Sequence, residues 1–266
     1  MFPIKPTHTC LTGTNMFDGY QLQNNKKRII EIRDLENDGF DFMLIYNDLK
    51  KTLPILTETK FDIKTRRYDI EFKKMFFVDK NFFKKNLEKN IIRFDIKKAY
   101  FSILKPFLSD KFLEKYKNTE KKHFLKAVGY SAYHKDVINN KTSQIDKERR
   151  TDRPDILKFC VEFLVYMNYF FRQIDVNFVW QYVDCFAFDY NIEKNNLIEA
   201  TKQIYEFFIE KRGLQNYIKR PFEIDFHIEK NQIIKADYNQ NYKAKKIYFE
   251  IEFLNIETGE IKTYNF

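Results

Sequence analysis

The sequence predicts an α+β protein in which helices back an antiparallel sheet. Three features indicate this class: an apolar, strand-like run at 91–95, an apolar helical pattern that begins at Pro154, and a strand-rich segment at 222–266. From residue 91 onward the expected order is strand, helices, hairpin, helix and strands. Strands and helices in such separate runs are typical of α+β proteins rather than of a parallel sheet.

The composition fits a folded chain with a basic surplus. Its 266 residues and 44% hydrophobic content suffice for one large or two modest domains, and only 6 Gly and 6 Pro argue against disorder. Lys and Arg number 47 against 38 Asp and Glu, giving a net charge of +9. Polyanions are therefore plausible partners, although charge alone is equally compatible with a solvated lysine surface.

Cysteine usage and hydropathy predict a reducing, aqueous setting. Cys10, Cys160 and Cys185 lack Cys-x-x-Cys spacing, so neither a disulfide framework nor a zinc site is expected. Residues 1–20 show no signal-peptide pattern, and no apolar run approaches the roughly 20 residues that span a bilayer. We expect a protein of the bacterial or host-cell cytoplasm with no membrane association.

The first half of the chain predicts few elements clearly. Residues 1–90 alternate short apolar runs with charge clusters and have no assigned role, although 81–90 favours a short basic helix. That helix leads into Ile91–Asp95, a buried strand that ends in a carboxylate. Residues 121–135 predict a second basic helix, and the polar stretch 136–152 is typical of a loop.

The second half is more regular. Pro154 opens a helix, because proline at a first helical position needs no backbone donor. Residues 177–190 predict a hairpin with its turn at Asp184-Cys185, and 197–212 predict an amphipathic helix stopped by Gly213. In the final segment the apolar residues alternate with polar ones at period two, and a turn is expected at Thr258-Gly259; the alternating residues are Phe222, Ile224, Phe226 and Ile228.

Two of these positions suit metal-assisted phosphoryl transfer. That reaction uses two Mg²⁺ ions about 3.5–4 Å apart, held by carboxylates. Asp95 at a strand end and Asp184 at a hairpin turn would supply them if their strands are neighbours. Most acidic residues are surface groups, so this pair alone is a weak signal.

The residues around Asp95 strengthen the signal. Asp95-Ile-Lys-Lys-Ala-Tyr100-Phe-Ser-Ile resembles the first palm motif of family-B DNA polymerases, Asp-x-x-Ser-Leu-Tyr-Pro-Ser-Ile. The resemblance places Tyr100 on the tyrosine that packs beneath the deoxyribose and excludes a 2′-hydroxyl. Read without the resemblance, the segment is an ordinary amphipathic turn after a core strand.

A second stretch resembles the fingers helix of the same family. Lys126-Ala-Val-Gly-Tyr-Ser-Ala-Tyr133-His134 keeps the Lys, Ser and Tyr of Lys-x-x-x-Asn-Ser-x-Tyr-Gly. Residues seven apart share a helix face, so the resemblance implies that Lys126 meets the triphosphate while Tyr133 abuts the base. Lys122, one turn earlier, would be a second phosphate ligand. The plain alternative is a basic amphipathic helix.

The hairpin carries the third motif with one change. Tyr182-Val-Asp184-Cys185-Phe186 resembles Tyr-x-Asp-Thr-Asp, but Phe186 replaces the second aspartate, a principal metal ligand in family B. The stretch also resembles the Tyr-x-Asp-Asp of reverse transcriptases, with Cys185 in the second aspartate's place. Either register leaves Asp184 as a ligand.

Lys246-Ile-Tyr248 resembles the Lys-x-Tyr motif that binds the primer terminus in family-B DNA polymerases. With it, four motifs occur in the order of that family over about residues 91–250. The resemblance implies a polymerase palm with short fingers helices at 91–221 and a small strand-rich, thumb-like part at 222–266. Residues 1–90 contain no convincing proofreading exonuclease.

Three functions remain open at this point. The first is a minimal DNA polymerase of a virus or mobile element, using Mg²⁺ or Mn²⁺, dNTPs and primer-template DNA, with a protein primer as a further expected partner. The second is a catalytically inactive polymerase-like module that binds nucleic acid or a protein partner. The replacement of the second motif aspartate by Phe186 favours this reading. The third is a reverse-transcriptase-like enzyme. Fold resemblance alone does not decide among them.

Overall fold

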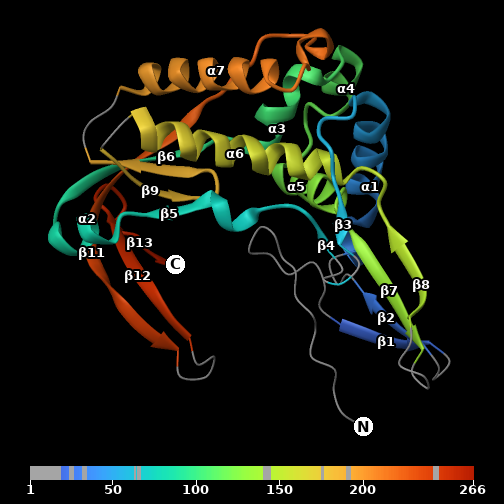
Figure 1. Cartoon of the computed structure of the whole chain (residues 1–266), viewed down its shortest axis with the longest axis horizontal. Coiled ribbons are helices and arrows are strands. Elements are labelled where there is room, and N and C mark those ends of the chain that lie inside the picture. The colour runs from blue at the N-terminus through green and yellow to red at the C-terminus, as the bar shows by residue number, and fades with distance from the viewer. Residues whose placement is uncertain are drawn as a thin grey trace. The chain divides into compact units, whose positions relative to one another are not determined.

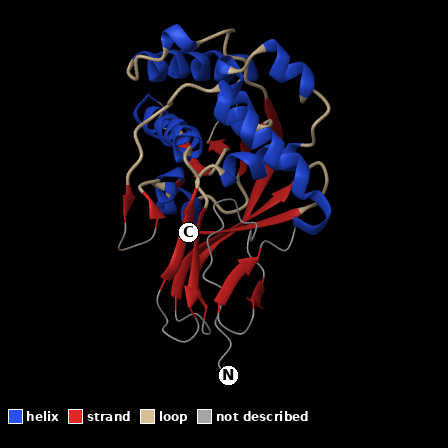
Figure 2. Cartoon of the chain, turned by 90° about the vertical axis from the view of Figure 1, so that its right-hand side faces the viewer, coloured by secondary structure: helices blue, strands red, loops and turns tan. Residues whose placement is uncertain are grey.

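The computed structural model describes residues 19–23, 27–31, 35–62, 64, 67–139, 145–174, 177–189, 193–241 and 246–266. Of residues 1–20, where no signal-peptide pattern is expected, only 19 and 20 are among the described residues. The chain divides into two compact units, 1–70 with 107–160 and 71–106 with 161–266 (Figure 1). Each combines helices with antiparallel strands, as the predicted α+β class requires (Figure 2).

This division differs from the expected boundaries after residues 90 and 221. The strands of 226–266 join the same sheet as the strand at 90–96, so they form no separate thumb-like part. The boundary expected after residue 90 falls inside the second unit. Both differences arise because strand pairing, not chain order, builds the sheet.

The first unit combines helices with a four-stranded antiparallel sheet in the order β1-β2-β7-β8. Its elements are β1 (Gly19–Gln23), β2 (Lys27–Glu31), α1 (Leu35–Thr52), β3 (Phe61–Asp62), β4 (Arg67–Tyr68), α4 (Asp110–Lys115), α5 (Lys121–Tyr130), β7 (His134–Asn139), β8 (Ile145–Arg150) and the first turns of α6 (Pro154–Ile174). The short helix η2 (Lys105–Phe107) leads into this unit from the second one.

The prediction of a loop at 136–152 is wrong, because β7 and β8 form an antiparallel hairpin there. Arg28 pairs with Ile138, so β7 gains its backbone partner from a strand more than a hundred residues earlier. A local hydrophobic pattern contains no trace of such a pairing. The helix expected over 121–135 is also too long: it ends at Tyr130, and the chain enters β7 at His134.

A buried ion pair holds α1 to the start of α6 within the first unit. The Arg153 guanidinium makes two hydrogen bonds of 2.9 Å to the Asp155 carboxylate. It also donates to the carbonyl oxygens of Lys50 (2.7 Å) and Leu53 (3.0 Å). Carbonyls at a helix C-terminus have no intrahelical donor, so Arg153 satisfies groups that α1 leaves open.

The second unit contains a seven-stranded antiparallel sheet in the order β13-β12-β11-β6-β10-β9-β5. Its elements are η1 (Phe72–Met75), β5 (Phe76–Val78), α2 (Lys80–Lys85), β6 (Asn90–Ile96), α3 (Ala99–Leu104), the rest of α6, β9 (Phe178–Tyr182), β10 (Cys185–Phe188), α7 (Lys194–Glu210), η3 (Gln215–Tyr217), β11 (Phe226–Asn241), β12 (Lys246–Asn255) and β13 (Ile261–Asn265). The predicted strand at 91–95, the helix from Pro154 and the hairpin at 177–190 are all confirmed.

Helices cover one face of this sheet, here called the helix face. Phe94 and Phe186 are cross-strand partners on it and are fully buried. Phe171 of α6 packs against Phe186, with ring centroids 5.5 Å apart. The apolar spacing that predicted this helix therefore marks the side that it presents to the sheet.

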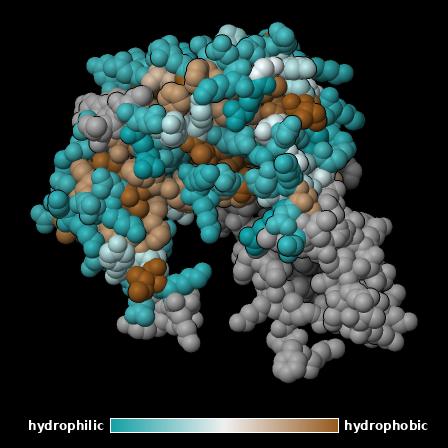
Figure 3. All heavy atoms as spheres, viewed as in Figure 1, coloured by the Kyte–Doolittle hydropathy of each residue, from teal (hydrophilic) through white to brown (hydrophobic). Residues whose placement is uncertain are grey.

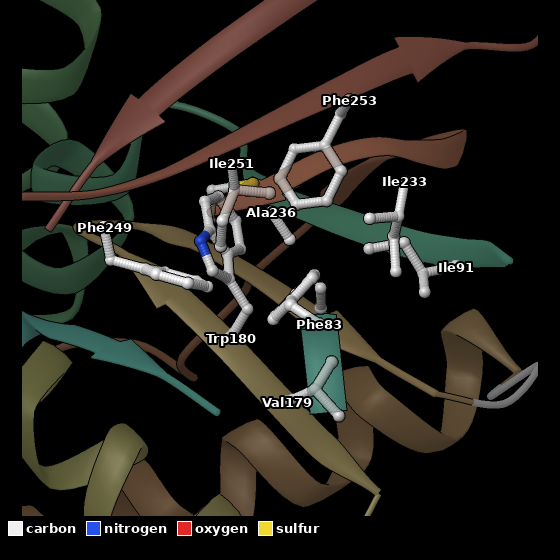
Figure 4. Packing of buried hydrophobic residues seen from close by; sticks show 11 residues of the cluster. Phe83, Ile91, Val179, Trp180, Ile233, Ala236, Phe249, Ile251 and Phe253 are labelled. Atoms are coloured by element: carbon white, nitrogen blue, oxygen red, sulfur yellow. The ribbon is translucent and has the colours of Figure 1, made fainter. Parts of the chain in front are cut away.

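The sheet curls toward its opposite face, here called the Asp95 face, so that side chains of β9 contact side chains of β12 and β13. Trp180 of β9 lies 5.5 Å from Phe253 of β12 and 4.9 Å from Tyr264 of β13, between ring centroids. Figure 4 shows Trp180 and Phe253 in the same cluster as Ile251 and Phe83. The curled strands thus enclose a second apolar core, which stabilises the edge that carries β13.

The turns predicted at Gly213 and Gly259 are confirmed, and the strand predicted from Phe222 is only partly so. Gly213 and Gly259 have φ values of +63° and +72°, which glycine adopts without a steric penalty. Strand β11 begins only at Phe226, and Ile228 is 36% exposed although the alternation predicted its burial.

No helix of the described residues is both long and apolar enough to cross a membrane, and hydrophilic residues cover most of the described surface seen in Figure 3.

Candidate functional site

Asp95 and Asp184 lie where two neighbouring antiparallel strands meet, as the sequence predicted. Asp95 is the penultimate residue of β6, and its register partner on β10 is Cys185. Asp184 precedes Cys185, and its carbonyl oxygen accepts a 3.1 Å hydrogen bond from the Ile96 amide. Both aspartates are half-buried. The backbone therefore brings two carboxylate-bearing residues together at one end of the central strands.

The turn that carries Asp184 is strained. Tyr182 pairs with Cys185, so the two-residue turn is Val183–Asp184, one position earlier than expected. Val183 has a φ of +58°, a conformation that is costly for a β-branched residue. The Val183 amide donates to the Met75 carbonyl (3.2 Å), and the Val183 carbonyl accepts from Gln181 Nε2 (2.8 Å). Strain held by such contacts is common at functional sites.

Replacing Val183 with glycine should stabilise the protein by about 1 kcal/mol, because glycine adopts positive φ without the steric cost. Urea unfolding of Val183→Gly and wild type measures the difference. Val78→Gly, in the regular strand β5, is the control and should destabilise by more than about 1 kcal/mol, because it also loses the packing of Val78 on the apolar core. If both variants lose stability equally, Val183 is not strained.

Cross-strand pairing sets which side chains share the Asp95 face. The row through Asp95 runs from His227 on β11 through Asp95 and Cys185 to Tyr182 on β9. Paired residues of adjacent strands lie on the same side of a sheet. Phe186, one residue further along, lies on the helix face. An aspartate at position 186 would therefore not share a face with Asp95, so its replacement by phenylalanine removes no carboxylate from this face.

Cys185 does not replace the missing carboxylate. Burial raises the pKa of its thiol to about 12; the nearby Arg93 guanidinium lowers it, and the Asp95 and Asp184 carboxylates raise it further. The thiol is consequently protonated near neutral pH. Protonated sulfur is a poor ligand for Mg²⁺, which prefers oxygen.

A divalent cation at this site would have two protein carboxylates. Among the described residues, no group of three or more His, Cys, Asp or Glu side chains is arranged to hold a metal. Mg²⁺ usually keeps several waters and binds through one or two carboxylates together with substrate phosphates. Asp95 and Asp184 therefore fit an Mg²⁺ or Mn²⁺ ion that is completed by water and phosphate oxygens, and they do not fit a closed protein cage.

The other predicted nucleotide ligands are divided between the two units. Tyr100 is the second residue of α3 in the second unit and is only 5% exposed. Lys122 and Lys126 are one turn apart on α5 in the first unit. Tyr133 lies beyond the end of α5 at Tyr130, so the prediction that it shares a helix face with Lys126 is wrong. Its ring stacks on Tyr130 instead, with centroids 5.0 Å apart.

The expected primer-binding residues lie at the start of β12, one of the strands that the curl of the sheet brings against β9. Lys246 and Tyr248 begin β12 and pair with Asn241 and Asn239 of β11. Phe249, the residue after Tyr248, exchanges two backbone hydrogen bonds with Phe266, whose ring centroid lies 5.8 Å from that of Tyr182. The curl of the sheet therefore brings this part of β12 toward the hairpin that carries Asp184.

Sequence reasoning missed two residues of the Asp95 face. His227 is the direct partner of Asp95 on β11, and Arg93 is buried on β6, two residues before Asp95. A signal for Arg93 existed, because a charged residue within the apolar run Ile91–Asp95 has to find partners inside the sheet. No local signal marked His227, since its position follows from the β6–β11 register.

Comparison with known proteins shows no family. No family model matches the chain, and no solved structure matches it. A stretch of 62 residues is 32% identical to mouse (Mus musculus) Aurora kinase C and covers 23% of this chain. The chain spans only about a fifth of that kinase, 22% of its length. A match of this extent is a local similarity and assigns neither a fold nor an activity.

Proposed function

We propose that the protein is a template-directed nucleotidyltransferase resembling a minimal family-B DNA polymerase without a proofreading exonuclease. Asp95 and Asp184 would hold Mg²⁺ or Mn²⁺, which would activate the primer hydroxyl and neutralise the departing pyrophosphate. The substrates would be dNTPs on primer-template DNA. The nucleotide-binding roles of Tyr100, Lys122, Lys126 and Tyr133 rest on the sequence resemblance alone.

One observation carries the proposal: two aspartates from separate motifs lie at the adjoining ends of neighbouring antiparallel strands. The register that pairs Asp95 with Cys185 and the hydrogen bond from Ile96 to Asp184 bring them together. The strained Val183 is a second, independent sign of a functional turn. A pair of structural surface aspartates would need neither feature.

The same hairpin residues are also compatible with a reverse-transcriptase-like alternative. Asp184 falls on the first aspartate of Tyr-x-Asp-Asp as well as on that of Tyr-x-Asp-Thr-Asp, and its place in the turn is the same for both. Template choice separates the two activities. A third candidate, an inactive binding module, is favoured by the lack of a third metal-binding side chain among the described residues.

Primer extension tests all three. The purified chain would be given a labelled primer annealed to a DNA or an RNA template, with dNTPs and either Mg²⁺ or Mn²⁺. Incorporation on DNA supports the polymerase, and preference for RNA supports the reverse-transcriptase-like enzyme. No product with either metal and either template would overturn the proposed activity and leave the binding module.

Binding to primer-template DNA should weaken steeply with salt, because the net charge of +9 favours phosphate contacts that release counterions. For about six such contacts, affinity should fall roughly a thousandfold between 50 and 200 mM salt. Fluorescence anisotropy of a labelled duplex measures this slope. Salt-insensitive binding, or none at low salt, would indicate a protein partner instead.

A further inference from the structure

Arg93 is a buried cation on the Asp95 face. It belongs to the central strand β6, and only 4% of its surface is exposed. Removing a guanidinium from water costs several kcal/mol unless other groups compensate it. Its surroundings therefore show what the sheet gains from placing a charge there.

The partners of Arg93 come from strands on both sides of β6. Its Nη2 donates to Tyr264 Oη at 2.6 Å and to Cys185 Sγ at 3.5 Å. Its Nη1 lies 3.2 Å from a carboxylate oxygen of Glu229, whose other oxygen accepts from Lys262 Nζ at 2.9 Å. One guanidinium thus joins β10, which follows the Asp184 turn, to β11 and to the C-terminal strand β13.

Strand β13 reaches the Asp184 hairpin through side chains. In the register of the described sheet its backbone pairs with β12, at the far edge from β10. The Tyr264 ring nevertheless contacts Tyr182, the residue before the turn, with centroids 5.0 Å apart. Arg93 and Tyr264 therefore connect the edge strand to both ends of the turn, at Tyr182 and Cys185.

We infer that Arg93 and Tyr264 are positioning residues that hold the β9–β10 hairpin against β6 and thereby set the separation of the Asp95 and Asp184 carboxylates for a divalent cation. This inference rests on the proposed function. Removing such contacts should weaken metal binding without unfolding the sheet, because supporting hydrogen bonds typically change metal affinity 10- to 100-fold. A purely structural role would change stability alone.

The chain contains its own reporter for this test. Trp180 is its single tryptophan, and it stacks on Tyr182 at a centroid distance of 6.2 Å. It lies two strands and two residues from Asp95 in the sheet, or about 12 Å. Paramagnetic Mn²⁺ bound between the two aspartates should quench its fluorescence, whereas Mg²⁺ should displace Mn²⁺ and restore it.

Mn²⁺ titrations of the full chain supply the readout. Wild type should show saturable quenching, and Asp184→Asn should show none. Tyr264→Phe, which keeps the ring, and Arg93→Lys, which keeps the charge but loses the planar donor group, should each need about tenfold more Mn²⁺. Both should melt within about 5 °C of wild type. Tyr217→Phe, at an exposed tyrosine of the same unit, should behave like wild type.

The outcomes separate the two proposals. Unchanged Mn²⁺ midpoints in Tyr264→Phe and Arg93→Lys, with quenching lost in Asp184→Asn, would overturn the positioning role and leave the metal site in place. The absence of saturable quenching in wild type would overturn the metal site and with it the positioning role. A raised midpoint that appears only in variants with a large loss in Tm would indicate a structural role and also overturn the inference.

Discussion

Asp184→Asn should abolish nucleotide incorporation by the protein. An asparagine preserves the size of the side chain and its place in the turn, but it removes the charge that holds a divalent cation. The loss should reach about a thousandfold, or about 4 kcal/mol of transition-state stabilisation, because the metal supplies several kcal/mol in phosphoryl transfer. The measurement is primer extension by wild type and variant side by side. Wild-type activity should be weak and stronger with Mn²⁺, because the site has only two carboxylates.

Two further variants make this comparison decisive. Asp95→Asn should match Asp184→Asn, since both carboxylates would bind the same ion. Asp237→Asn, the same change at an exposed aspartate of β11, should leave extension unchanged; its side chain is 73% exposed. Equal products from wild type and Asp184→Asn would rule out the mechanism. Equal losses in all three variants would indicate a general effect of charge.

Arg153→Met should destabilise the first unit by about 3–5 kcal/mol. The substitution leaves the Asp155 carboxylate buried without its bidentate partner, and breaking one side of a buried ion pair costs this much. It also removes the donors to the Lys50 and Leu53 carbonyls at the end of α1. Urea unfolding followed by circular dichroism measures the loss, and hydrogen exchange of the α1 amides locates it.

The control for this prediction is a more exposed arginine. Arg212 of the second unit pairs with Glu162 at 2.9 Å, and both side chains are partly open to solvent. Arg212→Met should therefore cost about 1 kcal/mol or less. Adding Asp155→Leu to Arg153→Met should recover part of the loss, because no buried charge then lacks a partner. Similar losses for Arg153→Met and Arg212→Met would show that the buried pair has no special role.

Local sequence patterns were sufficient for the elements around the site. The apolar run before Asp95 predicted β6, Pro154 with its apolar spacing predicted α6, and the β-branched and aromatic residues at 177–190 predicted the β9–β10 hairpin. Gly213 and Gly259 marked chain turns because positive φ favours glycine. Each signal lies within a few residues of the feature it predicts.

Prediction failed where a residue depends on a distant segment. The polar stretch 136–152 became a hairpin because β2 supplied a partner, and Tyr133 left the helix because the chain turns into β7. The turn at Asp184 moved by one residue because Tyr182 pairs with Cys185. In each case backbone pairing outweighed local propensity.

The sequence by itself determined that Asp95 ends a strand and that Asp184 lies at a hairpin of an α+β protein. Only the tertiary structure decided what surrounds them: His227 beside Asp95, Phe186 on the opposite face, and Arg93 buried against Tyr264. The physical reason is the two-residue period of a strand, by which a shift of one position moves every side chain to the other face. Register, which long-range pairing sets, therefore decides which side chains can act together.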